Sequence, residues 1–222
     1  MAIFHYETYY CAVCDAEVDC LRTPSMGVYG SRDLDGRPPE MKRSALRYSV
    51  QECPFCGYAN RTVEDFVPPF VTEDWLRSEA YQTCEGHRLK GEFARAHYHY
   101  YMLCKADQEN REAFDAILNA AWLCDDEKDR DGAIACRLIA LDRMKDCGYK
   151  KWSPEYALLR ADLLRRAEQF DRVPKETRVF LWPRGSRKQK TLHAFERQHA
   201  ALHDAACYTV DQALQMMQSD DA

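Results

Sequence analysis

Two pairs of cysteines, each separated by two residues, constrain this chain more than any other feature. The pairs are Cys11 with Cys14 and Cys53 with Cys56. This spacing lets one tight turn aim both sulfur atoms at the same point, and two such turns supply the four ligands of a tetrahedral zinc site. A thioredoxin-type redox site needs only one such pair, beside a βαβ pattern that this sequence does not show. We therefore predict a structural zinc site formed by these four cysteines.

The second pair lies in a segment whose other residues suit a metal-binding turn. Pro54 stiffens the turn, and Gly57, directly after the second cysteine, accepts the positive φ that lets backbone N–H groups face the sulfurs. Four protein ligands would close the coordination sphere, so we expect the metal to stabilise structure and not to catalyse. Cys20 and His5 are weaker candidates, each as a substitute for one of the four ligands.

The number of cysteines and the first residues bear on the protein's location, and the net charge bears on its partners. The chain has 11 cysteines, an odd number that disfavours a closed disulfide framework, and its first residues lack the basic and apolar stretches of an export signal. The formal net charge of -5 does not favour nucleic acid or an anionic membrane as a partner, and no run approaches the roughly 18 apolar residues of a membrane span. We expect a cytoplasmic protein with reduced thiols.

The first 70 residues show the pattern of short strands and loops. Residues 4–10 and 46–50 each lead into a cysteine pair and are predicted as extended segments, whereas 33–39 is a loop by its turn residues. The segment 15–52 between the pairs exceeds the roughly 15 to 20 residues of the commonest ribbon spacing. We therefore expect it to be ordered separately from the metal site or to project as an insertion.

After Pro68 and Pro69 the periodicity becomes helical, and this change is the predicted domain boundary. Five helices and a last long one are expected, at about 72–87, 91–104, 110–124, 130–147, from Ser153 onward, and 188–216. The helix after Asn110 is apolar on two sides and should lie between neighbours, and the next carries the apolar residues Ile134, Leu138, Leu141 and Met144.

Short sequences that begin with glutamate at residues 79, 112 and 155 resemble one another near predicted helix starts. They indicate irregular helical-hairpin repeats of the tetratricopeptide kind. The predicted fold is therefore mainly α. It comprises a zinc-ribbon-like module at residues 1–70 and a tetratricopeptide-like antiparallel bundle at residues 71–218.

Other groupings of reactive side chains are weaker. Two clusters could in principle bind a second metal: Cys84 and His87 with His97 and His99, and the pair His199 and His203. Packed or capping roles are favoured for both, since the second pair lacks the glutamate of a zinc-protease helix. No phosphate-binding loop or nucleophile elbow occurs, so no catalytic residue is predicted, although a pocket near His97 and Tyr101 is one way in which the chain could act as an enzyme.

The segment from Tyr48 to Ala59, YSVQECPFCGYA, together with the first cysteine pair and the following helices, resembles the bacterial domain-of-unknown-function family 2225. Looser similarity covers residues 79–170. The first pair departs from the pattern because proline and glycine are absent around it, and Pro174 interrupts a further repeat helix. The resemblance implies a zinc-ribbon-like part joined to a tetratricopeptide-like part, and no activity.

Two functions follow as hypotheses. The first is a zinc-binding protein-interaction or scaffold protein whose helical domain binds a protein or peptide partner. The alternative is a nucleic-acid-associated zinc-ribbon protein that uses the basic run at 184–190, predicted as an exposed loop, with Arg184, Arg187, Lys188 and Lys190 as contacts.

Overall fold

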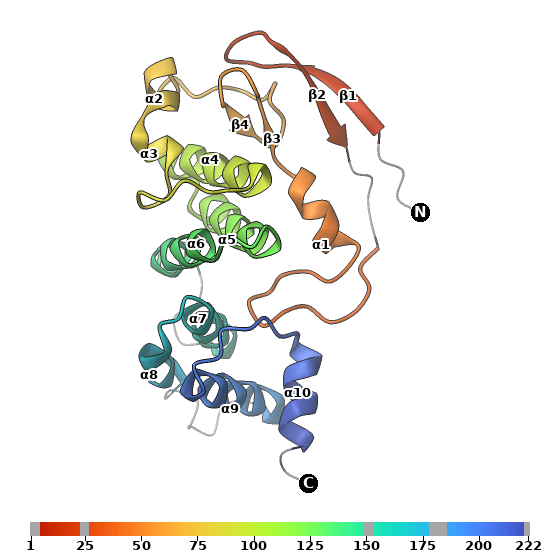
Figure 1. The fold of residues 1–222 in the computed structure, drawn as a ribbon, viewed down its shortest axis with the longest axis vertical. Helices are drawn as coiled ribbons and strands as arrows, with labels where there is room; N and C mark the ends of the chain where they lie inside the picture. Colours follow the sequence, from red (N-terminus) through yellow and green to blue (C-terminus); the bar gives the residue numbers. More distant parts are fainter. Residues whose placement is uncertain (1–4, 23–26, 149–152, 178–185, 220–222) are drawn as a thin grey trace. The chain divides into compact units, whose positions relative to one another are not determined.

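The computed structural model describes residues 5–22, 27–148, 153–177 and 186–219, and it is mainly helical (Figure 1). A small N-terminal antiparallel β-hairpin precedes a series of packed helices, which confirms the predicted fold class. The N-terminal elements are β1 (His5–Tyr10), β2 (Glu17–Arg22), α1 (Lys42–Ala45), the 3-10 helix η1 (Leu46–Tyr48), β3 (Gln51–Glu52) and β4 (Ala59–Asn60). The later elements are α2 (Glu73–Arg77), α3 (Glu79–Gln82), α4 (Glu92–Ala106), α5 (Asn110–Asp126), α6 (Arg130–Arg143), α7 (Pro154–Arg166), η2 (Phe170–Arg172), α8 (Val173–Thr177), α9 (Arg187–Ala201) and α10 (Val210–Ser219).

The chain forms two compact units, and neither is continuous in sequence. The first comprises residues 1–27 and 44–143, and the second comprises residues 28–43 and 144–222. The segment 28–43, which lies between the two cysteine pairs, thus belongs to the second unit. The expectation that the long segment between the pairs is ordered separately from the metal site is confirmed for this part. The domain boundary near residue 70, where the metal-binding module would end, stays a prediction.

The first unit contains two β-hairpins. Strands β1 and β2 pair antiparallel from His5 opposite Arg22 to Tyr10 opposite Glu17, and β3 pairs with β4. The extended segment predicted at 46–50 is wrong over most of its length, because residues 46–48 form η1. The rings of Tyr48 and Phe93 meet edge to face at 5.5 Å, so packing on α4 overrides the local strand propensity.

The first predicted helix starts where expected and ends early. Thr72 caps α2, and its hydroxyl accepts a hydrogen bond from the Trp75 N–H at 3.2 Å. The predicted helix to residue 87 is wrong, because Ser78 adopts an extended conformation (ψ 147°) and caps a separate helix, α3. A serine side chain that bonds to the backbone N–H three residues later competes with helix continuation.

Helices α4, α5 and α6 lie side by side, with α5 packed against both neighbours (Figure 1). Their predicted ranges are confirmed to within a few residues. Small and apolar side chains are buried all round α5, as expected for a helix between neighbours; they are Ala113, Phe114, Ala116, Ile117, Leu118, Ala120, Ala121, Trp122, Leu123 and Cys124.

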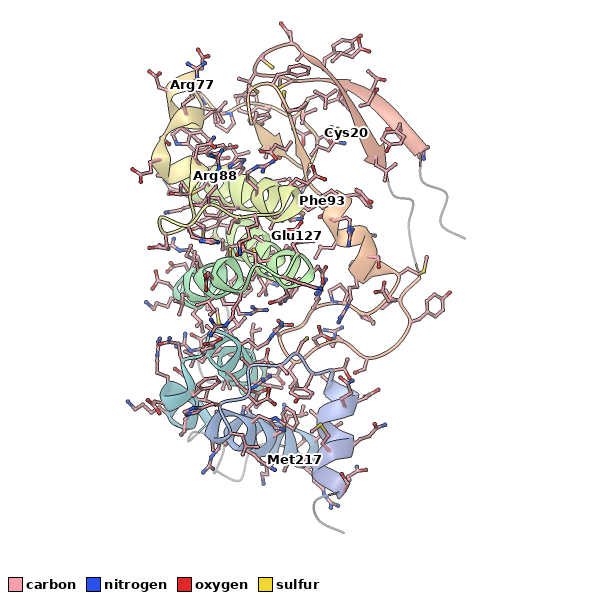
Figure 2. All side chains as sticks on the ribbon, in the orientation of Figure 1. Cys20, Arg77, Arg88, Phe93, Glu127 and Met217 are labelled. Carbon is pink, nitrogen blue, oxygen red and sulfur yellow. The ribbon has the colours of Figure 1, made fainter. Side chains whose placement is uncertain are left out.

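The end of α5 lies against the start of α4. Gly91 holds the N-cap position and has no side chain to accept a hydrogen bond, whereas the Glu127 carboxylate lies near enough for the Phe93 backbone N–H to favour its charged form; Figure 2 labels both residues. A Cβ on Gly91 would overlap this carboxylate. Burial raises the pKa of Glu127, and the helix N-terminus favours its charged form.

Replacement of Gly91 by alanine is therefore expected to displace the Glu127 side chain. The free energy of unfolding should fall by about 1 kcal/mol, the usual value of an N-cap. Urea denaturation of Gly91→Ala, Glu127→Ala and the double variant checks this. The two losses should not add, because both substitutions remove one interaction; additive losses would contradict the proposed cap.

Helix α6 buries a face made largely of small residues. Its buried side is made of Gly132, Ala133, Cys136, Arg137, Ala140 and Leu141. Of the four apolar residues noted in its sequence, Leu141 and Met144 are buried, but Ile134 is only half-buried and Leu138 is 36% exposed. The small residues on the other face allow α6 to approach α5 more closely, which explains why that face is buried. Ile134 and Leu138 therefore form an apolar stripe on α6 that stays partly exposed.

The second unit is built from α7 to α10 with segment 28–43. Ser153 caps α7 as predicted and accepts a hydrogen bond from the Tyr156 N–H at 3.1 Å. Ser186 and Gln189 form a capping box at the start of α9, so residues 187–190 of the basic run are helical and not a loop. Arg184 and Gly185 lie outside the described residues. Figure 2 labels Met217 on α10, which packs against α9.

The predicted last helix over 188–216 is interrupted at residues 202–209. The buried Arg165 side chain donates hydrogen bonds to the backbone carbonyls of Asp204 and Ala206 at 2.9 and 2.8 Å. His203 adopts a left-handed conformation at φ 54°, which ends α9. Contacts made by a distant arginine thus break a pattern that is locally helical.

The core of the second unit includes Leu34 from segment 28–43. Leu34 packs with Leu192 and Phe195 of α9 and Ala213 of α10. The Asp35 carboxylate accepts a hydrogen bond from Arg166 at 2.6 Å, and both side chains are buried. Apolar packing and a buried ion pair therefore hold this segment in the unit.

Along the described helices, none combines the length and apolar character that crossing a bilayer requires.

Candidate metal centre

The sulfur atoms of Cys11, Cys14, Cys53 and Cys56 all lie within 4.8 Å of one another. The Cys11 and Cys56 sulfurs are 3.6 Å apart, and those of Cys14 and Cys53 are 3.7 Å apart. Four sulfurs at about 2.3 Å from a central zinc ion would be roughly 3.8 Å from each other. The separations therefore fit a tetrahedral thiolate site, and the predicted residues come together as expected. This is the only cluster able to hold a metal ion among the residues that the structure describes.

Each cysteine pair forms the turn of one β-hairpin. In the first turn the Cys11 N–H donates to the Ala16 carbonyl at 2.9 Å, and the Asp15 N–H donates to the Cys11 carbonyl at 2.8 Å. In the second turn Cys53 and Gly57 make the equivalent bonds, at 2.8 and 2.9 Å. Two hairpin turns of the same geometry thus face each other across the sulfurs.

The residue after each second cysteine has positive φ, at 78° for Gly57 and 56° for Asp15. The missing glycine in the first pair is therefore replaced by aspartate, one of the few other residue types that visit this region. The position of Asp15 directly after Cys14 was the sequence signal that could have shown this equivalence.

Backbone and side-chain contacts join the two turns. The Ala12 N–H donates to the Val63 carbonyl at 2.9 Å, and the Val63 N–H donates to the Gln51 side-chain oxygen at 3.0 Å. Val63 is fully buried and Gln51 nearly so. The segment after β4 therefore bridges the first turn to the strand before the second, and neither residue carries a sequence signal of this role.

A stacked pair of rings joins the second turn to the helices of the same unit. The Tyr81 hydroxyl on α3 donates to the Gly57 carbonyl at 2.8 Å, and its ring stacks on His99 of α4 at 4.2 Å between centroids. His99 Nδ1 lies 2.8 Å from the Glu52 carboxylate, next to Cys53 in sequence. Glu52 also faces Arg95, at 3.4 Å. These contacts orient the second turn independently of any metal.

Burial and backbone hydrogen bonds act in opposite directions on the thiols. Burial raises the pKa of Cys11 and of Cys56. Burial also acts to raise the pKa of Cys53, but hydrogen bonds from the backbone N–H groups of Cys56 and Phe55, together with those from the Cys14 and Cys11 thiols, lower that pKa. The site thus favours a thiolate at Cys53, and a divalent cation would supply the charge that the other sulfurs need to ionise.

Gly57 provides a test of the turn geometry. A Cβ at this position would meet no atom within 4 Å, so Gly57→Ala introduces only the cost of a left-handed conformation. We expect a loss of about 1 kcal/mol in the free energy of unfolding and weaker metal retention against a chelator. Gly86→Ala is the matched control, because Gly86 also has positive φ and open space. Equal metal retention by both variants would show that the turn conformation does not support the site.

The two substitute ligands do not join the cluster. Cys20 lies in β2 opposite Glu7, and burial raises its pKa to about 11. His5 is exposed at the start of β1, and its Nε2 lies 2.8 Å from the Glu7 carboxylate. The sulfur of Cys20 and the imidazole of His5 are absent from the metal cluster.

The residues of the first cluster considered as a second metal site have separate partners. The Cys84 sulfur lies 3.7 Å from that of Cys136, and His87 pairs with Asp129 at 3.0 Å. His97 is fully buried between the Ser49 hydroxyl and the Phe93 carbonyl, and burial lowers its pKa to about 4. The packing roles favoured for these side chains are in keeping with their contacts.

The histidine pair of α9 also has separate partners. His199 Nδ1 lies 2.6 Å from the Asp204 carboxylate, which pairs the imidazole with an acid directly after the helix. The His203 ring stacks on Phe170 at 4.9 Å between centroids. The two rings therefore do not converge on a common point in a metal cluster.

No family model matches this chain, and neither curated proteins nor solved structures include a match. The resemblance to the bacterial family 2225 therefore stays a prediction.

Proposed function

We propose that Cys11, Cys14, Cys53 and Cys56 hold a structural zinc ion and that the protein acts as an interaction or scaffold protein. The convergence of four sulfurs from two hairpin turns supports the first part. Four thiolates prefer zinc among the abundant divalent cations and leave no coordination position for a substrate.

The hairpins have little apolar core of their own, which is why a metal would matter to them. Several aromatic side chains near the turns are exposed, namely Tyr6, Tyr10, Phe55 and Phe66. Small modules that cannot bury enough apolar surface commonly rely on a structural metal. The proposed zinc ion would thus stabilise the hairpins and fix the Glu52 and Gly57 contacts to α3 and α4.

The proposed interaction role rests on the helical part of the chain. The incompletely covered stripe on α6 is the kind of surface that a protein or peptide partner buries. The nucleic-acid alternative depends on Arg184, Arg187, Lys188 and Lys190, and a net charge of -5 does not favour it. A cytoplasmic location stays part of this proposal.

Affinity capture with the full-length chain tests the interaction role. We expect the immobilised, zinc-loaded protein to retain at least one protein from a native lysate reproducibly, and an unrelated bait of equal net charge to retain none of it. Binding of labelled DNA and RNA at low salt is measured in parallel. Absence of any enriched protein would contradict the proposal, and salt-sensitive nucleic-acid binding would favour the alternative.

A further inference from the structure

Two adjoining cavities of the first unit lie along α3, α4 and α6. Their volumes are about 580 and 370 Å³, and both are lined by Glu85, Tyr101, Lys105 and Ile139. Because they share these four residues, the two cavities adjoin, and we call them together the α4–α6 groove. The first cavity is also lined by Leu138 and Asp131, and the second by Glu79.

The floor of the groove is an apolar stripe at helical spacing. On α6, Ile134, Leu138 and Ile139 line it, and on α4 Tyr101 and Met102 do so. Leu138 is 36% exposed although the amphipathic pattern of α6 marks it as a core position. The sequence thus supplies two apolar faces to α6, and α5 covers only one of them. The second face is what an additional apolar partner would bury.

Tyr101 lies at the junction of the two cavities. The side chain is 2% exposed, and it lines both cavities. Its ring contacts Tyr98 and lies under the Lys105 ammonium at 5.8 Å. Its hydroxyl is not among the buried atoms that lack a hydrogen-bond partner, so it can exchange water for a polar group of a bound chain.

The rim of the groove is predominantly acidic. Its charged residues are Glu79, Glu85, Asp131 and Asp142 against Lys105 and Arg143. Arg143 faces Asp142 at 3.5 Å, so these two offset each other. Glu79 and Glu85 have no ion-pair partner in the described part of the chain. A ligand with positive charges beside the apolar floor would therefore complement the groove.

We infer that the α4–α6 groove binds an amphipathic segment of a partner protein that places aliphatic side chains on the floor and lysine or arginine beside the acidic rim. An aliphatic residue over Leu138 would bury the exposed part of the α6 stripe, and basic residues would lie against Glu79 and Glu85. This inference rests on the proposed interaction role and names the chemistry of the partner.

The test uses the full-length protein and two fluorescein-labelled synthetic peptides. Both have leucine at helical i, i+3, i+4 and i+7 spacing; the other positions are lysine in one peptide and glutamate in the other. Fluorescence anisotropy at physiological salt gives the two dissociation constants. We expect the lysine peptide to bind at least roughly tenfold more tightly than the glutamate peptide.

Paired variants locate the binding. Glu79→Lys with Glu85→Lys should weaken binding of the lysine peptide roughly tenfold. The control is Glu64→Lys with Asp171→Lys, which changes net charge equally at exposed sites outside the groove lining. Leu138→Ser should also weaken binding, whereas Leu202→Ser, at a 68% exposed leucine outside the groove, should not.

Equal affinity for the two peptides, or equal effects of the groove and control variants, would overturn the inference. That result is distinguishable from failure of the proposed function. If lysate capture succeeds while the peptides do not discriminate, the protein has a partner but the groove is not its site. If the peptides bind as expected and capture fails, the groove inference holds and the proposed interaction role loses its support.

Discussion

Replacement of Cys53 by serine is expected to abolish metal binding and to destabilise the two N-terminal hairpins. Structural zinc contributes roughly 10 to 16 kcal/mol of apparent binding free energy in small zinc-dependent domains, and a site with three thiolates loses most of it. Here the hairpins also keep their contacts to α3 and α4, so we expect a loss of several kcal/mol and not complete unfolding of the unit. Metal analysis and thermal unfolding of the purified variant measure both effects.

Cys20→Ser is the matched control for Cys53→Ser. Cys20 is a half-buried cysteine of the same hairpin that lies outside the sulfur cluster. It should retain the full metal content, with a change in stability below about 1 kcal/mol, as is usual for substitutions away from special features. Loss of metal from Cys20→Ser, or full metal content in Cys53→Ser, would show that the ligand assignment is wrong.

Replacement of Arg165 by methionine is expected to have the second large effect, on the second unit. The guanidinium is fully buried and lies 2.8 Å from Glu196 and 2.6 Å from Asp162, which are also buried. It also donates to two carbonyls of the break after α9. Removing one member of a buried ionic group usually costs 3 to 5 kcal/mol, because the remaining charge is left without compensation. Urea denaturation should show a loss of about this size.

Arg160→Met is the control for the buried arginine. Arg160 pairs with Glu176 at 2.8 Å, but both side chains are partly exposed. Its loss should therefore cost about 1 kcal/mol or less. Equal losses for the two variants would contradict the view that burial makes the Arg165 network important.

The pH dependence of stability reports on Glu196. Burial is the largest cause that raises the pKa of Glu196 well above its ordinary value of 4.5, and the neighbouring Asp162 raises it further. A raised folded-state pKa means that the folded state holds the proton more tightly. Its contribution to stability is complete below pH 4.5 and is lost as pH rises through the folded-state pKa. In Glu196→Gln this part of the pH dependence should disappear; an unchanged slope would contradict it.

Local sequence signals predicted much of the structure correctly. The cysteine spacing identified the cluster, because the geometry of a two-residue turn depends on few neighbours. Thr72 and Ser153 cap helices where expected. A capping side chain accepts a hydrogen bond from the backbone N–H three residues later, so the interaction lies within one helical turn. The two-sided apolar pattern of α5 indicated a central helix.

The remaining features depend on contacts between residues far apart in sequence. Segment 28–43 belongs to the second unit because Leu34 and Asp35 meet partners in α7, α9 and α10. The break after α9 depends on Arg165, about forty residues earlier. The buried face of α6 does not follow from its own sequence, because both faces are apolar and only the fit of small residues against α5 selects one.

The metal content of the purified, reduced full-length protein tests the central claim most directly. Elemental analysis should find one zinc ion per chain, and replacement by cobalt should give the visible absorption of a tetrahedral four-thiolate site, lost in Cys53→Ser. Protein that folds fully without stoichiometric metal would contradict the account.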